Sequence, residues 1–208
     1  WVLDRAGLEP GFFIGGIPKS FGAGAAIGYG ERSLTKKPAP FVVEGDEYDA
    51  VYWHKQPKFN DYVGVSKDDV AIVTSIEHDH IDIYPDATAY ERAFATLFER
   101  VPERGLLVCD ARDARVRELA AKSARVRVTY YALDGDDTGG VDPTWSAALG
   151  PSDGDAQFFD VFGASAALGT YVSASKMPVR IWIENSVSEA LPNTYHQPIG
   201  PTRPRGTG

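Results

Sequence analysis

The sequence predicts an α/β fold in which a mostly parallel sheet is flanked by helices. Apolar, β-branched runs with the length of buried strands recur along the chain, at residues 41–44, 70–76, 105–109 and 126–131. Segments with helical spacing of apolar residues separate the last three runs, and this alternation is typical of parallel sheets. Acidic residues and histidines follow two of the runs directly. They are candidates for a site, because ligands of such sheets bind at the carboxyl ends of the strands.

The amino-terminal part is rich in glycine. Trp1 to Leu8 has the pattern of the last turns of a helix that stops at Gly7, so we expect a fragment whose upstream part is missing. Phe12 to Ile14 is predicted to be a short strand that runs into the turn Gly15-Gly16. Gly22 to Gly28 approximates the glycine fingerprint of dinucleotide sites, but it does not follow a strand and open a helix, as that fingerprint requires. A substrate loop or plain turns are the better interpretation.

Two helices are predicted in the middle of the chain. The first is capped by Asp86 or Thr88 and places three apolar residues at helical spacing, namely Phe94, Leu97 and Val101. The second spans residues 110–123 and turns Val116, Leu119 and Ala120 inward. We expect a loop at residues 134–140 and a small antiparallel element at 158–161 and 170–172.

The domain organisation follows from where the periodicity ends. We expect one partial domain over residues 1–177 and an irregular tail over residues 178–208, where prolines and glycines replace any regular pattern. The single cysteine, Cys109, excludes an internal disulfide. It follows the apolar run Leu106 to Val108, and a buried structural thiol is therefore the favoured interpretation over a nucleophile.

The bulk composition limits the class of partner. The chain has 208 residues and 43% hydrophobic content, which suits a buried core. The net charge of −8 offers no basic stripe to meet phosphates, so we expect no nucleic acid partner. A small anion is still possible at a metal ion or a helix terminus. No signal peptide or membrane span is visible, so we expect a cytoplasmic protein with no membrane partner.

The two acidic segments suggest a metal site. Glu44 ends the first strand, and His80 follows the second. If these strands are neighbours in the sheet, Glu44 and His80 meet in one crevice and can hold a divalent cation. Mg²⁺ prefers oxygen ligands and keeps its waters, so one or two protein groups with phosphate oxygens are sufficient. Two alternatives stay open, a solvated acidic turn and a zinc site made by His78, His80 and Asp82.

Several motifs, in order along the chain, resemble the central domain of the Mur ligases. They are Gly11-Phe12-Phe13-Ile14-Gly15-Gly16-Ile17-Pro18, Phe21-Gly22, Val43 to Asp49, Lys58-Phe59 with Tyr62, and Ser75 to Asp82. The resemblance covers roughly residues 1–177 and implies a fold of the P-loop NTPase type, truncated here. Within the family, Glu44 to Asp49 and Lys58-Phe59-x-x-Tyr62 are most similar to the branch that joins UDP-N-acetylmuramate to a peptide such as L-Ala-γ-D-Glu-meso-diaminopimelate. The branch that adds L-alanine is the alternative.

The resemblance implies an ATP-dependent ligase of peptidoglycan recycling. The γ-phosphate of ATP passes to a substrate carboxylate, and an amine then attacks the acyl phosphate. Carried over from the family, Glu44 and His80 are the catalytic pair that binds Mg²⁺, and Gly15 and Gly16 form a substrate-facing turn. Three acidic neighbours are expected to orient these two ligands without binding the ion themselves, namely Asp46, Glu47 and Asp79.

The sequence departs from the family in three places. No G-x-x-x-x-G-K-[ST] motif occurs, so the ATP-binding residues are unknown and we expect the isolated chain to be inactive. The family's Gly-x-His-Asn segment is replaced by Ile181 to Asn185, and no carboxyl-terminal domain follows, which suggests a reading-frame shift beyond Arg180. A common family asparagine is Ser75 here. Two hypotheses of other classes stay open, a zinc-dependent hydrolase and a non-enzymatic remnant.

Overall fold

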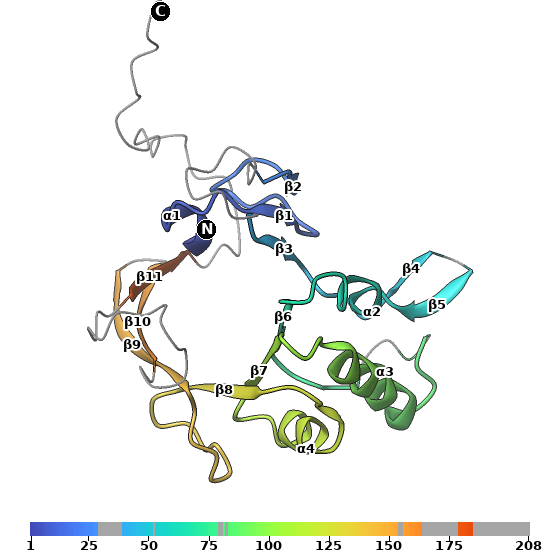
Figure 1. The fold of residues 1–208 in the computed structure, drawn as a ribbon. Helices are drawn as coiled ribbons and strands as arrows, with labels where there is room; N and C mark the ends of the chain where they lie inside the picture. Colours follow the sequence, from blue (N-terminus) through green and yellow to red (C-terminus); the bar gives the residue numbers. More distant parts are fainter. Residues whose placement is uncertain are drawn as a thin grey trace, which may run out of the picture.

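A six-stranded sheet is the largest element of the structure. The structure, a computed structural model, describes residues 1–28, 39–51, 53–78, 81, 83–153, 156–163 and 179–184. The strand order is β11-β10-β9-β8-β7-β6 (Figure 1). The strands are β6 (Val70–Val73), β7 (Leu106–Asp110), β8 (Val128–Leu133), β9 (Trp145–Asp153), β10 (Ala156–Gly163) and β11 (Val179–Glu184). Strands β6 to β9 run parallel, whereas β10 and β11 are joined antiparallel. The predicted α/β class is confirmed, with a parallel half that matches the prediction.

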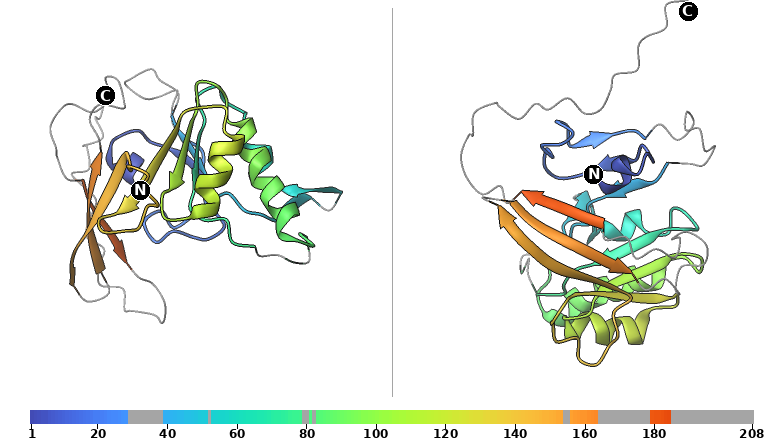
Figure 2. Two further views of the ribbon diagram at one scale, coloured as in Figure 1. Left: turned by 90° about the horizontal axis from the view of Figure 1, so that it is seen from below. Right: turned by 90° about the vertical axis from the view of Figure 1, so that its left-hand side faces the viewer.

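Two helices cover one face of the parallel strands (Figure 2). They are α3 (Ala87–Arg100) and α4 (Ala114–Ser123). Asp86 caps α3, as predicted, by accepting a hydrogen bond from the backbone N–H of Ala89 at 2.7 Å. The helical spacing of the apolar residues places their side chains in one core with the strands. The main core side chains are Tyr90, Phe94, Leu97 and Phe98 from α3, Leu107 and Cys109 from β7, and Val116 from α4.

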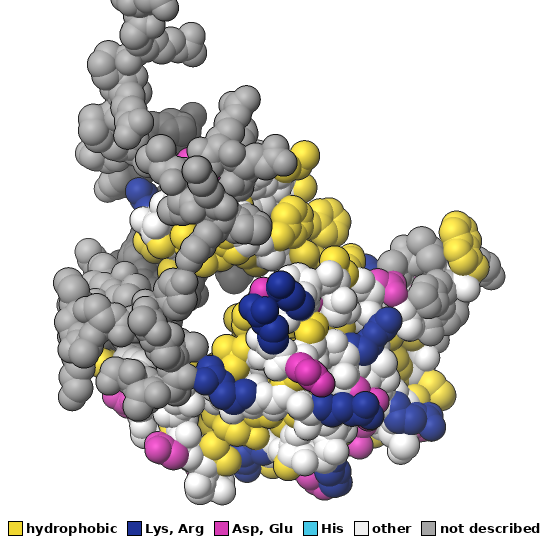
Figure 3. Space-filling model, viewed as in Figure 1, with side chains coloured by type: hydrophobic (Ala, Val, Ile, Leu, Met, Phe, Trp, Pro, Cys, Tyr) yellow, Lys and Arg dark blue, Asp and Glu magenta, His cyan; other side chains and the backbone are white. Residues whose placement is uncertain are grey.

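A second, smaller sheet is built by the amino-terminal part. Its order is β2-β1-β3, with β1 (Gly11–Phe13) parallel to β3 (Phe41–Val43) and antiparallel to β2 (Ala25–Ala26). Helix α1 (Val2–Arg5) precedes it, and Gly7 has a φ of 74°, which agrees with the predicted helix stop. Figure 3 shows apolar side chains gathered over this sheet. The exposed ones include Phe13, Ile17, Ile27 and Phe41.

A hairpin and a short helix connect the two sheets along the chain. The hairpin strands are β4 (Asp49–Val51) and β5 (His54–Pro57), and helix α2 (Phe59–Tyr62) follows. Phe59 packs its ring 5.0 Å from that of Phe94 on α3, which fixes α2 against the main core. None of the helices described in the structure is both long and apolar enough to cross a membrane.

The structure corrects one expectation about how the strands are arranged. The metal hypothesis supposed that strands 41–44 and 70–76 are neighbours in one sheet, but β3 belongs to the small sheet and β6 ends the large one. A cavity of about 270 Å³ lies between them. Among the described residues, neither strand pairs across this space. The expectation failed because strand pattern identifies a strand but not its partner.

One strand end and one additional strand also differ from the prediction. Strand β6 ends at Val73 and not at residue 76, and beyond it Ile76 donates its backbone N–H to the carboxylate of Asp113 at 2.8 Å instead of to a strand. We predicted an irregular tail from residue 178, but Val179–Glu184 forms β11, antiparallel to β10. The β-branched residues Val179, Ile181 and Ile183, at every second position, suit such an added strand. The boundary at residue 177, the predicted strand at 170–172 and the rest of the tail lie outside the described residues.

Candidate functional site

The loop that follows β3 and the segment that follows β6 are tied together. The hydroxyl of Tyr84 donates a hydrogen bond of 2.6 Å to the backbone carbonyl of Glu47. The hydroxyl of Tyr90 donates to Oε1 of the same residue at 3.3 Å. Glu47 lies shortly after Glu44, and Tyr84 lies shortly after His80. The structure therefore holds together the two parts of the chain on which the predicted metal ligands lie.

Burial and charge keep the donor in this tie protonated. Tyr84 is 6% exposed. Burial raises its pKa to about 12, and the negative charges of Glu47, Asp49 and Asp46 add to the effect. The hydroxyl therefore keeps its proton and can donate throughout the neutral range. The aromatic packing supports the same geometry, since the rings of Tyr84 and Tyr90 meet edge to face at 5.1 Å.

A lysine partly balances the acidic loop. The ammonium of Lys58 contacts Oδ2 of Asp46 at 2.7 Å, and the other oxygen of Asp46 accepts the backbone N–H of Tyr48. The hydrogen bond from Lys58 to Asp46 is the main cause that raises the pKa of Lys58, and the charge of Glu44 contributes in the same direction. Asp46 is therefore engaged in holding the loop. The sequence predicted that Asp46 orients the two metal ligands, Glu44 and His80, and that role stays a prediction.

Glu44 meets the predicted substrate-facing turn. Its side chain is exposed directly after β3, and its Oε2 accepts the backbone N–H of Gly15 at 2.5 Å. A Cβ added at Gly15 would lie 3.1 Å from this oxygen, so a larger residue would crowd the carboxylate. Nothing lies within 4 Å of a Cβ added at Gly16. The sequence predicted Glu44 and Gly15 for separate roles, and the structure shows that they are in direct contact.

The predicted partner of Glu44 cannot be placed beside it. His80, Asp79 and Asp82 lie outside the described residues, so the Glu44–His80 pair stays a prediction. Glu44 itself fits a magnesium ion in chemical terms, because it presents an exposed carboxylate at the end of a strand. The carboxylate is already oriented on one side by Gly15.

The zinc alternative gains no support from the residues described. Nε2 of His78 lies 3.1 Å from the backbone carbonyl of Tyr84, and its ring packs 5.7 Å from that of Tyr90. His78 thus has a structural role in the turn that leads to α3. In the part of the chain that the structure describes, no three His, Cys, Asp or Glu side chains gather where they could hold a metal ion.

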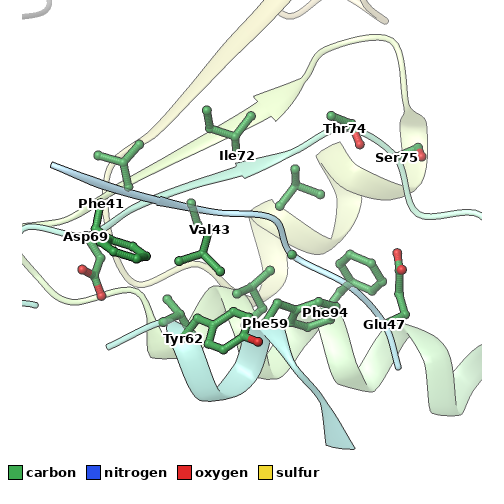
Figure 4. A pocket seen from close by; sticks show the side chains of 16 residues that line it. Phe41, Val43, Glu47, Phe59, Tyr62, Asp69, Ile72, Thr74, Ser75 and Phe94 are labelled. Atoms are coloured by element: carbon green, nitrogen blue, oxygen red, sulfur yellow. The ribbon is translucent and has the colours of Figure 1, made fainter. Parts of the chain in front are cut away.

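The cavity between the sheets adjoins these residues (Figure 4). Phe41 and Val43 of β3 line one side, and the whole of β6 lines another. Its floor is apolar and includes Phe59 and Phe94 from the main core. Glu47 and Ser75 bring polar groups to one end. Sequence reasoning missed this cavity, because it depends on the separation of two strands that the metal hypothesis supposed to be neighbours.

Comparison with known proteins gives a consistent family. Residues 53–188 match the Mur ligase middle domain. The ligase of Haemophilus influenzae named UDP-N-acetylmuramate–L-alanyl-γ-D-glutamyl-meso-2,6-diaminoheptandioate ligase is 35% identical over 136 residues, which cover 65% of this chain and 27% of the relative. A UDP-N-acetylmuramate–L-alanine ligase of Roseiflexus castenholzii is 40% identical over 110 residues, or 52% of this chain and 19% of the relative.

Solved structures agree with these sequences. The UDP-N-acetylmuramate:L-alanyl-γ-D-glutamyl-meso-diaminopimelate ligase of Neisseria meningitides superposes with a TM-score of 0.60 at 32% identity, covering 78% of this chain and 46% of that one. A murein peptide ligase of Psychrobacter arcticus gives a TM-score of 0.59 at 22% identity, covering 91% of this chain and 36% of that one, and supports the fold alone. The chain spans about a quarter of the length of the curated relatives it matches.

Proposed function

This chain belongs to the Mur ligase family, and we propose that it is part of an ATP-dependent ligase that joins UDP-N-acetylmuramate to a peptide amine. Relatives named as L-alanyl-γ-D-glutamyl-meso-2,6-diaminoheptandioate ligases match the chain, and so do relatives named as L-alanine ligases. We favour the peptide-joining branch, because Tyr48 and the Lys58-Phe59-x-x-Tyr62 motif follow its pattern. Peptidoglycan recycling is the corresponding process.

The tie between Tyr84 and Glu47 is the observation that best supports this proposal. It fixes the loop after β3 against the approach to α3, although the two residues are 37 positions apart. In the sequence, Glu44 and His80 precede the two bonded residues by only a few positions. A site that depends on both residues needs such a connection, whereas a solvated acidic turn does not.

Within this proposal, the residues of the chain have distinct roles. Glu44 and His80 would hold a Mg²⁺ ion, which would supply positive charge to stabilise the negative charge of a phosphoryl group. Gly15 orients the carboxylate of Glu44 through its backbone N–H. Gly15 and Gly16 leave the turn beside it without side chains, which lets a substrate approach the backbone.

Metal binding provides the direct test of the site. We expect titration of the chain with Mn²⁺, a paramagnetic substitute for Mg²⁺, to broaden the resonances of the residues near Glu44. The variant Glu44→Gln should weaken this binding about ten-fold or more, because it removes the charged oxygen ligand. Glu103→Gln is a matched control, since Glu103 is exposed at the turn before β7, away from the carboxyl ends of the strands. Equal Mn²⁺ affinity in the two variants would contradict the proposed site.

We also propose that the isolated chain does not turn over. It contains no G-x-x-x-x-G-K-[ST] motif, which in P-loop proteins holds the phosphates of the nucleotide. Incubation with ATP, Mg²⁺, UDP-N-acetylmuramate and the tripeptide should therefore release no phosphate above background. Measurable ligation by the purified chain would overturn this part of the proposal.

A further inference from the structure

The side chain of Asp113 connects two elements through its two oxygens. Its Oδ1 accepts the backbone N–H groups of Arg115 at 2.8 Å and Val116 at 3.2 Å, which caps α4. Its Oδ2 accepts the backbone N–H of Ile76 at 2.8 Å, across 37 positions of sequence. An N-cap needs only one of these oxygens. The second oxygen therefore serves a contact that lies outside the helix.

Ile76 is the point at which the segment after β6 is fixed. Its side chain is 1% exposed and belongs to the main core. The strand has already ended at Val73, so no neighbouring strand receives this N–H group. Four residues further along the sequence lies His80. The position of Ile76 thus fixes the start of the described segment Ile76 to His78, which precedes the predicted metal ligand in the sequence.

The surroundings of this contact indicate that it is a defined junction. The segment from Thr74 to His78 and the start of α4 line an open cavity of about 670 Å³ on either side of it. Both partners of the bond from Ile76 to Asp113 line this cavity, and the bond links the segment directly to the start of the helix. Asp110 and Arg112, also on its wall, pair with each other.

We propose that Asp113 is a positioning residue that holds the segment from Ile76 to His78, which precedes the predicted ligand His80 in the sequence, in place for metal binding. The inference rests on the proposed function, because it assigns Asp113 to the same site. Asp113 acts through the backbone of Ile76 and does not itself bind the metal. Loss of the oxygen that faces Ile76 frees the segment while the cap of α4 remains.

Two variants of Asp113 distinguish its bond to Ile76 from its capping of α4. Asp113→Asn keeps one capping oxygen and replaces the other by an amide donor, which cannot accept the N–H of Ile76. Asp113→Ser keeps a good capping group but has a single, shorter oxygen. The matched controls are Asp86→Asn and Asp86→Ser, because Asp86 caps α3 through a local bond to Ala89. Amide hydrogen exchange of Ile76 and the affinity for Mn²⁺ are measured in all four variants.

We expect both Asp113 variants to speed amide exchange at Ile76 and to lower the affinity for Mn²⁺ about ten-fold, with α4 still helical by circular dichroism. The Asp86 variants should change neither quantity. Unchanged exchange at Ile76, or unchanged Mn²⁺ affinity where the parent chain binds the ion, would overturn the inference. If the parent chain and Glu44→Gln both fail to bind Mn²⁺, the proposed metal site fails, and with it the role of Asp113 in metal binding. The exchange data then decide only whether the tether exists.

Discussion

At the scale of single residues, burial determines what Cys109 can do. Its side chain lies in β7 with 0% exposure. Burial raises the pKa of the thiol to about 12, and the charge of Asp110 adds to this. Because the thiolate is the reactive form, a neutral and inaccessible thiol is a poor nucleophile. The structure thus agrees with the prediction of a structural cysteine.

Alkylation of Cys109 should therefore report on unfolding. We expect iodoacetamide at pH 8 to leave the native chain unmodified and to modify it fully in urea, since the chain has one cysteine. Mass spectrometry measures the modified fraction with time. Labelling of the native chain as fast as that of the unfolded chain would contradict the buried position.

Asp110 and Arg112 predict a dependence of stability on pH. Burial alone would raise the pKa of Asp110, but the hydrogen bonds and charge of Arg112 outweigh it and the pKa is lowered. A lowered pKa means that the fold favours the ionised carboxylate. The resulting stability is present above the ordinary pKa of aspartate, about 3.9, and is lost as the pH falls through the lowered value.

The variant Arg112→Gln should remove much of this effect. We expect it to lower the free energy of unfolding by about 1–2 kcal/mol at pH 7 and by less at pH 3, because pH 3 lies below the ordinary aspartate pKa of about 3.9 and the unfolded chain already binds the proton there. Urea titration at both pH values measures the difference. Arg104→Gln is the control, because its partner Asp68 is exposed and such pairs contribute little. An equal loss at the two pH values would show that the Asp110 carboxylate is not responsible.

At the scale of elements, local signals were sufficient for the helices and for the existence of most strands. The cap at Asp86 and the spacing of Phe94 and Leu97 located α3 because both signals lie within the helix itself. Helix α4 begins at Ala114 and not at residue 110, since Asp113 is its cap and Asp110 still belongs to β7. Strand β9, Trp145–Asp153, was missed because its sequence has no sustained alternation of apolar and polar residues.

The hydrogen bond from Tyr84, before α3, to Glu47, in the loop after β3, leads to a prediction about stability. Tyr84→Phe keeps the packing of the ring against Tyr90 and removes the hydroxyl that bonds Glu47. We expect a loss of about 1–2 kcal/mol in the free energy of unfolding, because the carbonyl of Glu47 loses this donor. Chemical denaturation followed by fluorescence measures it. Tyr90→Phe should cost less, since its bond to Glu47 is longer, at 3.3 Å.

At the scale of the whole molecule, the site could be predicted only in part from the sequence. Motifs identified Glu44 and Gly15, and the sequence order of the motifs identified the family. Their contact through Oε2 of Glu44 and the tether at Asp113 join residues far apart in the chain. No local pattern encodes such contacts. The separation of β3 from β6 was missed for the same reason, because strand pairing is a property of the assembled sheets.

The separation of the two sheets leaves apolar strand edges exposed, and this has a consequence in solution. On β6, Val70 is 58% exposed and Ile72 67% exposed, and on β3 Phe41 is 59% exposed. Among the described residues, the edges of β3 and β6 that border the cavity have no paired strand. Such edges offer unpaired backbone groups and apolar side chains to another chain. We therefore expect the purified chain to self-associate as its concentration rises.

A charge on the edge of β6 should oppose this association. We expect Ile72→Lys to shift sedimentation velocity profiles toward the monomer, because a lysine on an edge strand disfavours pairing with another chain. Ile17→Lys is the matched control, since Ile17 is 74% exposed in the loop after β1 and the change alters charge and apolar surface equally. A monomeric parent chain at high concentration, or equal effects of the two variants, would show that the β6 edge does not drive association. A selective effect of Ile72→Lys would mean that the edge of β6 is where another chain pairs, as its unpaired backbone groups predict.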